Sequence, residues 1–199
     1  MIVKICGITN LADALAAVDF GASALGFNFY PQSPRYIAPE EAARLIEALP
    51  AGPWKVGVFV NEPPESVLRI AALAHLDVVQ LHGEADFPAG PFRVWKALPV
   101  DANFHPGRLD AYTAEAILLD APSGELYGGT GKTFDWARAA ASSRKIVIAG
   151  GLDADNVAAA IQQARPWGVD ACSRLESSPG RKDHARMARF LKAALGVGI

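Results

Sequence analysis

Short apolar segments of this chain end in side chains that can move protons. Cys6, His82 and Asp120 each lie at the end of such a segment or directly after it, and Asp170 lies inside another. Thiol, imidazole and carboxyl groups are the common acids and bases of enzymes. If the apolar segments are parallel strands of a barrel, their carboxyl ends meet at one face and these groups share one site.

A second set of residues suits the binding of anions. Gly150 and Gly151 follow one apolar segment, and Ser173 and Arg174 follow another. Backbone N–H groups in such loops can hold a phosphate. Arg35 lies in a loop between two apolar segments, and its planar guanidinium can grip a carboxylate with two hydrogen bonds.

Each of these residues also has an ordinary structural explanation. A cysteine in an apolar strand is often a small core residue, and an aspartate that ends a strand often caps the next helix. His82 can simply bond a backbone carbonyl, and Arg35 can be a solvated loop charge. The functional interpretation therefore depends on several polar groups converging at one end of one fold.

The segments that must position these groups alternate between two patterns. Apolar segments rich in Val, Ile and Leu, too short for helices, predict strands at Ile2–Cys6, Ala24–Phe29, Lys55–Val60, Val78–Leu81, Arg93–Ala97, Ala116–Asp120, Lys145–Ala149 and Gly168–Cys172. Helical patterns lie between them at Leu11–Phe20, Pro39–Leu49, Pro64–Ala74, Trp136–Ala141, Ala154–Arg165 and Asp183–Leu195. Pro39 and Pro64 suit first-turn positions, and Asp153 suits an N-cap.

Strand–helix alternation predicts parallel strands joined by crossover helices. Eight strands fit a closed α/β barrel, whereas six would fit a doubly wound sheet. The segments Glu84–Gly90 and Ala102–Tyr112 are broken by proline and glycine, so we expect shortened or irregular helices after strands four and five. No linker divides the chain, and residues 1–199 are expected to form a single (β/α)8 TIM-barrel domain.

Composition is that of an ordinary soluble globular protein. The chain has 199 residues, 51% of them hydrophobic and 20% charged, with a net charge of -2. This balance favours no nucleic-acid or anionic-membrane partner. No apolar stretch is long enough for a membrane span, and the first residues lack the apolar core of a signal peptide. Two cysteines are too few for a disulfide framework, so we expect a cytoplasmic, reduced protein.

One motif resembles a nucleotide-binding loop without meeting its requirements. The segment Gly128–Thr133 reads GGTGKT, but a Walker A loop needs glycine five residues before the Gly-Lys pair, and that position is Leu126. A mobile lid over the site is the functional expectation for this glycine-rich loop, and a plain connection is the alternative.

Motifs spread along the whole chain resemble phosphoribosylanthranilate isomerases. They are KICGIT at Lys4–Thr9, GFNFYPQSPRYI at Gly26–Ile37, VGVFVNE at Val56–Glu62, VVQLHG at Val78–Gly83, LLD at Leu118–Asp120, GGTGKTFDW at Gly128–Trp136, AGGL at Ala149–Leu152 and ESSPGRKD at Glu176–Asp183. They occur in the family's order from residue 2 to about residue 190. Together they are specific, although a Gly-Gly pair or LLD alone would carry little weight.

The resemblance implies a cofactor-free Amadori rearrangement in tryptophan biosynthesis, with no metal. N-(5-phosphoribosyl)anthranilate would become 1-(2-carboxyphenylamino)-1-deoxyribulose 5-phosphate. The family's strand-one cysteine is its general base and its strand-six aspartate is its general acid, which correspond to Cys6 and Asp120. Lys4 shares the face of Cys6, so it can lower the pKa of the thiol, hold the barrel together, or both.

The remaining site residues would bind the substrate. Arg35 is expected to hold the anthranilate carboxylate, and His82 is expected to contact the substrate. Asp170 is expected to orient the substrate or to pair with Lys4. Phosphate would be bound at Gly150, Gly151, Ser173 and Arg174. The expected partner is this phosphosugar–anthranilate molecule, and the chain would act as a monomer or homodimer.

The end of strand eight departs from the family's pattern. The family typically has Ser-Ser-Gly-Val-Glu where this chain has Cys172-Ser173-Arg174-Leu175-Glu176. Arg174 stands in place of glycine. If the glycine of the family needs a positive φ, the loop of this chain must have a different conformation. If it does not, the loop is kept and Arg174 adds a positive charge near the phosphate. Cys172 would lie close to Cys6, because strands one and eight are neighbours in a closed barrel.

Two other functions fit parts of this pattern. A histidine-pathway isomerase shares the barrel and the reaction type but uses carboxylates as both acid and base, which Cys6 argues against. A phosphate-binding barrel without catalysis would be expected to lack Cys6 or Asp120, yet both are present. The altered loop after strand eight is the remaining argument for this second alternative.

Overall fold

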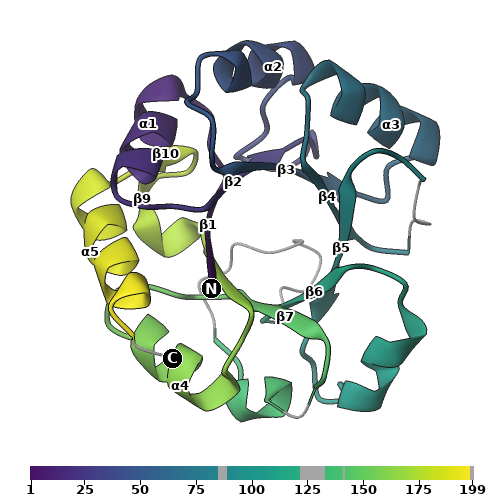
Figure 1. The fold of residues 1–199 in the computed structure, drawn as a ribbon, viewed down its shortest axis with the longest axis vertical. Helices are drawn as coiled ribbons and strands as arrows, with labels where there is room; N and C mark the ends of the chain where they lie inside the picture. Colours follow the sequence, from purple (N-terminus) through teal and green to yellow (C-terminus); the bar gives the residue numbers. More distant parts are fainter. Residues whose placement is uncertain (85–88, 122–132, 141, 198–199) are drawn as a thin grey trace.

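Eight parallel strands close into a barrel in the computed structural model of this chain, which describes residues 1–84, 89–121, 133–140 and 142–197 (Figure 1). Strands β1 and β8 pair in parallel and complete the ring, so the barrel prediction is confirmed and the doubly wound sheet is wrong. The strands are β1 (Ile2–Cys6), β2 (Ala24–Asn28), β3 (Trp54–Val60), β4 (Val78–His82), β5 (Arg93–Pro99), β6 (Ala116–Asp120), β7 (Lys145–Ile148) and β8 (Gly168–Ala171).

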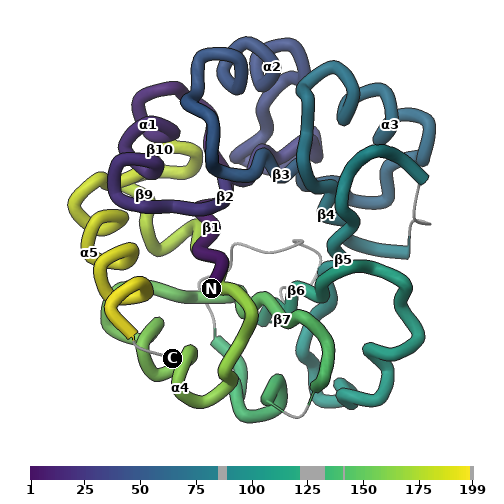
Figure 2. Tube along the Cα trace, in the orientation of Figure 1, coloured from purple at the N-terminus to yellow at the C-terminus, as the bar shows by residue number. Residues whose placement is uncertain are grey.

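Helices surround the ring of strands, as the ribbon and the tube both show (Figures 1 and 2). Asn10 caps the first helix by accepting the Asp13 N–H, and Asp183 caps the last one in the same way. Pro39 and Pro64 occupy first turns as predicted. The α-helices are α1 (Leu11–Asp19), α2 (Pro39–Glu47), α3 (Pro64–Leu73), α4 (Val157–Ala164) and α5 (His184–Leu195).

The barrel has thin helical cover beside β4, β5 and β6. No helix is assigned to the described residues between β4 and β5, and a 3-10 helix, η1 (Pro106–Ala111), follows β5. These features confirm the trimmed cover predicted after strands four and five. The helix predicted at Trp136–Ala141 is wrong, because only the 3-10 turn η2 (Trp136–Ala139) forms. The Ser142 hydroxyl accepts the Arg144 N–H just afterwards, which turns the chain toward β7.

An arginine holds the irregular segments where helices are missing. The Arg144 guanidinium donates to the backbone oxygens of Leu109, Tyr112 and Ala114, at 2.5 to 3.0 Å. These bonds satisfy carbonyl groups that a regular helix would have paired internally. The side chain of Arg144 thus fixes the η1 region against β7.

Two further boundaries differ from the sequence prediction. Asp153 does not cap α4; its carboxylate accepts the N–H groups of Asp155 and Asn156, and the helix begins only after that turn. Strand β8 ends at Ala171, because Cys172 has φ -139° and ψ -89° and leaves the strand. A 3-10 turn, η3 (Ser173–Leu175), and a small hairpin, β9 (Glu176–Ser178) with β10 (Arg181–Lys182), follow it, and the sequence patterns had not predicted them.

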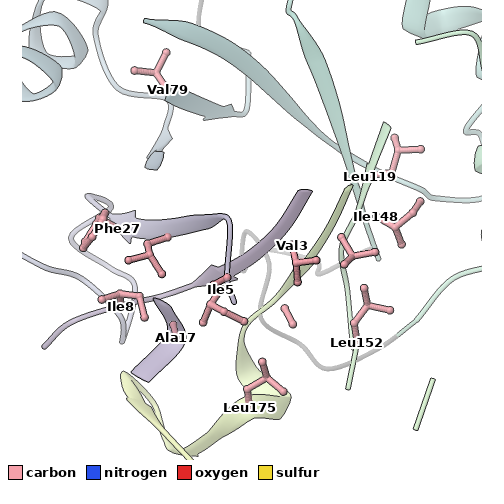
Figure 3. Packing of buried hydrophobic residues seen from close by; sticks show 14 of the residues in the cluster. Val3, Ile5, Ile8, Ala17, Phe27, Val79, Leu119, Ile148, Leu152 and Leu175 are labelled. Carbon is pink, nitrogen blue, oxygen red and sulfur yellow. The ribbon is translucent and has the colours of Figure 1, made fainter. Parts of the chain in front are cut away.

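Alternation along each strand separates two packing layers. Side chains on the outer face pack beneath the helices and loops, and Figure 3 shows Val3, Ile5, Phe27, Leu119 and Ile148 among them. On the inner face, Trp54, Trp95 and Trp167 meet with ring centroids 5.7–6.2 Å apart. Trp54 begins β3, Trp95 lies near the start of β5, and Trp167 directly precedes β8, so the amino-terminal end of the barrel is filled. The polar residues are left at the carboxyl ends.

Candidate active site

The barrel brings the predicted proton-transfer groups to one end. Cys6, His82 and Asp120 are the last residues of β1, β4 and β6. Asp120 and Asp170 line one pocket, which Cys172 also lines. The Cys6 sulfur acts electrostatically on both carboxyl groups. These residues therefore form one cluster at the carboxyl ends of the strands.

Cys6 occupies a position that stabilises its thiolate. Its sulfur lies against the backbone of β2, where a Cβ atom on Gly26 would come within 2.8 Å of it. A hydrogen bond with Cys172 lowers the pKa of the Cys6 thiol well below its ordinary value, and the charge of Lys4 acts in the same direction, although burial opposes both. These surroundings favour the thiolate form of Cys6, the form that can accept a proton.

Lys4 is a buried cation held between negative groups. Its side chain is fully buried, and its Nζ lies 2.9 Å from Asp170 Oδ1. Burial alone would lower the pKa of Lys4, but the charges of Asp170 and Cys6 outweigh burial and raise it. Of the two roles expected for Asp170, pairing with Lys4 is the one the geometry provides.

Lys4→Met is expected to raise the pKa of Cys6, because the cation that stabilises the thiolate is removed. Thiolate absorbance in the ultraviolet, followed against pH, measures the shift, with Cys6→Ser as the blank. The variant also leaves Asp170 without its partner, which costs about 3–5 kcal/mol of unfolding free energy.

The double variant Lys4→Met/Asp170→Asn separates the two effects. It removes the unpaired carboxylate and is expected to recover part of the lost stability while the Cys6 titration stays shifted. An unchanged Cys6 titration in Lys4→Met would mean that Lys4 only holds the barrel together.

Asp120 is a carboxyl group that keeps its proton to a higher pH than an ordinary aspartate. Its Oδ1 accepts the Ala121 N–H at 2.8 Å, yet burial dominates and raises the pKa of Asp120 to about 6. Gly150 allows this arrangement, because a Cβ atom there would lie 2.7 Å from both Asp120 Oδ1 and the Ala121 nitrogen. Its φ of +84° also favours glycine. Asp120 can therefore donate a proton in a site where Cys6 accepts one.

His82 is a neutral group in this cluster. Burial, with the nearby charges of Lys4 and Lys96, lowers the pKa of His82 to about 3. Its Nε2 lies 2.9 Å from the amide nitrogen of Gln80, which faces the same side of β4. A neutral imidazole suits hydrogen bonding to a polar ligand better than it suits binding a second anion.

Arg35 is held by a carboxylate that the sequence analysis had quoted without giving it a role. Its Nε and one terminal nitrogen bind both oxygens of Glu176, at 2.7 to 3.1 Å. Lys182, whose side chain is fully buried, lies 2.9 Å from Glu176 Oε1. Burial would raise the pKa of Glu176, but the two cations lower it. Glu176 thus fixes Arg35 beside the barrel opening.

Gly150, Gly151, Ser173 and Arg174 lie together after β7 and β8, around the pocket that also contains Asp120. The guanidinium of Arg174 pairs with Asp153 at 2.5 Å, so this residue spans the two loops. The lid predicted at Gly128–Thr133 lies outside the described residues, except for Thr133.

A metal-binding cluster and a membrane-spanning helix are both absent from the described ranges. These ranges contain no group of three or more His, Cys, Asp or Glu residues arranged to hold a metal ion. No helix assigned in them is long and apolar enough to cross a membrane.

Comparison with known proteins places this arrangement in a family. The family model of N-(5'-phosphoribosyl)anthranilate (PRA) isomerase matches residues 3–193. A relative from Solibacter usitatus with that enzyme's name is 56% identical over 203 residues, which cover 99% of this chain and 100% of the relative.

Solved structures agree with this assignment. The phosphoribosyl anthranilate isomerase of Thermotoga maritima has a TM-score of 0.88 and 45% identity, covering 98% of this chain and 100% of the other. An isomerase structure in complex with reduced 1-(o-carboxyphenylamino)-1-deoxyribulose 5-phosphate has a TM-score of 0.87 and 43% identity, with the same coverage. The chain described here belongs to the N-(5'-phosphoribosyl)anthranilate isomerase family.

Proposed function

We propose that this chain converts N-(5-phosphoribosyl)anthranilate into 1-(2-carboxyphenylamino)-1-deoxyribulose 5-phosphate, with Cys6 as general base and Asp120 as general acid. The reaction is the isomerisation of its family and belongs to tryptophan biosynthesis. The observation that carries the proposal is the placing of Cys6 and Asp120 at one barrel end, in surroundings that lower the pKa of the thiol and raise the pKa of the carboxyl group. A relative solved with a reduced form of the product supports the choice of ligand.

The proton transfers in this reaction match the directions in which the pKa values of Asp120 and Cys6 are shifted. Asp120 donates its proton to the ribose ring oxygen, and the ring opens to a protonated imine. The positive imine acidifies the hydrogen on the sugar's second carbon, and the Cys6 thiolate removes it. The resulting enolamine rearranges to the amino-ketose product. Each step needs the group in the form that its surroundings favour, and none needs a cofactor.

Substrate binding uses the groups around this pair. The phosphate is held by the N–H groups of Gly150, Gly151, Ser173 and Arg174, in a position typical of phosphate sites in barrels. Arg35 binds the anthranilate carboxylate, and Glu176 keeps its guanidinium in place. His82 offers a neutral ring to the substrate. Asp170 acts mainly by holding Lys4 beside the base.

The direct test is turnover of the proposed substrate by the purified chain. Anthranilate adducts fluoresce, so the loss of fluorescence follows the reaction, and mass spectrometry identifies the product. Turnover is expected with no added cofactor or metal and in the presence of a chelator. Saturable binding without turnover would instead indicate a phosphate-binding barrel that lacks this activity.

Arg35→Lys is expected to raise KM about 10- to 100-fold, because a two-pronged bond to a carboxylate is worth about 1.5–3 kcal/mol. Steady-state kinetics with the anthranilate adduct and with the corresponding aniline adduct measure the effect. Wild type should discriminate strongly against the aniline adduct, and the variant should discriminate little. Equal discrimination by both proteins would place the carboxylate elsewhere.

Partners and location follow from the same proposal. The chain acts on a small molecule as a monomer or homodimer, in the cytoplasm, without a nucleic-acid or membrane partner. A Thermotoga maritima structure that covers 98% of this chain at 44% identity is described as monomers generated from a dimeric phosphoribosylanthranilate isomerase. Light scattering on the purified chain measures its oligomeric state.

A further inference from the structure

Two cysteines stand side by side at the active end of the barrel. Strands β1 and β8 are neighbours, and their register pairs Lys4 with Asp170 and Ile5 with Ala171. Cys6 follows Ile5 in β1, and Cys172 follows Ala171 at the end of β8. Neighbouring strands lie about 4.8 Å apart, which is within the Cα separation of about 4.4–6.8 Å that a disulfide requires. The backbone thus brings the two residues into reach of a bond.

The two thiols also act on each other. Cys6 and Cys172 are free cysteines in partly exposed positions. Their interaction lowers the pKa of the Cys6 thiol and raises the pKa of the Cys172 thiol. The Cys172 sulfur lies 3.8 Å from both Glu176 Oε1 and Lys182 Nζ. It therefore sits between the base and a buried ion pair, at the rim of the pocket that contains Asp120.

We propose that Cys6 and Cys172 form a peroxide-modification site, in which Cys6 is oxidised first and Cys172 then closes a disulfide within the chain. The oxidant is hydrogen peroxide or an organic hydroperoxide. Formation of the disulfide depends only on the two sulfurs. Its effect on the enzyme rests on the proposed function of Cys6, because a base held in a disulfide cannot accept a proton.

The chemistry balances in two steps. The Cys6 thiolate attacks one peroxide oxygen, the O–O bond breaks, and Cys6 becomes a sulfenic acid while hydroxide leaves. The Cys172 thiol gives its proton to that hydroxide, and the resulting thiolate attacks the Cys6 sulfur. The S–S bond forms and the S–O bond breaks, and the second hydroxide takes up the proton that the Cys6 thiol released to solvent when it ionised. Two thiols are oxidised by two electrons, and the peroxide is reduced to water.

The surroundings assign the order of these steps. Cys6 is the more nucleophilic sulfur, because its hydrogen bond with Cys172 and the charge of Lys4 stabilise its thiolate. The same hydrogen bond raises the pKa of the Cys172 thiol, with burial and the negative charge of Cys6 adding to the effect, while Lys182 and Arg35 oppose it. Oxidation of Cys6 removes that negative charge. The two cations then favour a Cys172 thiolate just when one is needed.

The experiment treats the purified full chain with hydrogen peroxide and measures intact mass, free thiols and activity. The mass of wild type is expected to fall by two hydrogen atoms, and both free thiols should disappear. On a non-reducing gel the protein should still run as a single chain, because the disulfide does not link two chains. Its activity should fall to that of the Cys6→Ser variant. Dithiothreitol should restore mass, thiols and activity together.

Cys172→Ser is the matched variant, because it keeps a hydroxyl donor beside Cys6 but cannot form the bond. Its mass should not fall by two hydrogen atoms. With dimedone present, Cys6 should be trapped as a sulfenic acid, and without dimedone it should gain further oxygen atoms. Dimedone labelling of wild type to the same extent, without the two-hydrogen loss, would overturn the proposal. If the disulfide forms in wild type and the activity does not change, the modification site stands, but Cys6 is not the general base.

Discussion

Cys6→Ser is expected to lower kcat by about 10²–10⁴-fold, the range usually lost with a general base. A serine hydroxyl is almost the same size but does not ionise near neutral pH, so the acceptor for the substrate's carbon-bound proton disappears. KM should change little, because the phosphate loops and Arg35 remain. Fluorescence kinetics on the anthranilate adduct measure both constants, and thermal unfolding confirms that the barrel is intact.

The neighbouring strand supplies the control. Cys172→Ser makes the same chemical change next to Cys6, and its hydroxyl can still donate to the Cys6 sulfur, so its kcat should fall far less. Replacing the hydrogen at the substrate's second carbon by deuterium adds a second measurement. A slowed reaction in wild type places proton removal in the rate-limiting step. If Cys6→Ser kept near-normal kcat, another group would have to be the base.

The fold was predictable because its signal is repeated. Eight apolar segments with helical patterns between them leave few arrangements, and a barrel accommodates all eight. The errors fell where local structure depends on distant partners. The Trp136 segment has helix-forming composition, yet only a 3-10 turn forms, and its Arg138 donates to the backbone oxygens of Asp101 and Phe104, more than 30 positions away. The β9–β10 hairpin is similarly short, and its strands are too brief for periodicity to reveal them.

The candidate site was partly predictable for a related reason. Groups at strand ends, such as Cys6 and Asp120, are located by the barrel rule alone. Glu176 was missed as a functional residue because its partner Arg35 is 141 positions away, and no sequence spacing reports that contact. Lys182 was missed for the same reason. In the sequence, Lys182 followed by the helix cap Asp183 has the composition of an ordinary surface segment.

Charge explains why one barrel end can hold an acid and a base at once. Lys4 lies near both groups, and it stabilises the Cys6 thiolate while Asp170 keeps the lysine charged. Asp120 is near the same lysine, but burial and the negative Cys6 outweigh that attraction and raise the pKa of Asp120 to about 6. The pKa values of two acidic groups in one site are thus shifted in opposite directions, as acid–base catalysis requires.

Asp120→Asn is expected to lower kcat by about 10²–10⁴-fold, because the amide cannot give a proton to the ribose ring oxygen. The same residue sets the pH dependence of wild type. With its pKa at about 6, the protonated fraction of Asp120 falls as pH rises through 6, and kcat/KM should fall with it. On the acid side, kcat/KM should fall as the Cys6 thiolate becomes protonated, at a pH below the ordinary pKa of a thiol.

The fall of kcat/KM on the alkaline side is the part of the pH profile that identifies the general acid. In Asp120→Asn it should vanish, so the residual kcat/KM stays flat as pH rises through 6, while the acid-side decline from Cys6 remains. Asp170→Asn is the comparison, because it alters a carboxyl group in the same pocket that the mechanism does not use as the acid. That variant should keep the decline, although its midpoint can move. An alkaline decline that survives in Asp120→Asn and vanishes in Asp170→Asn would transfer the role of general acid to Asp170.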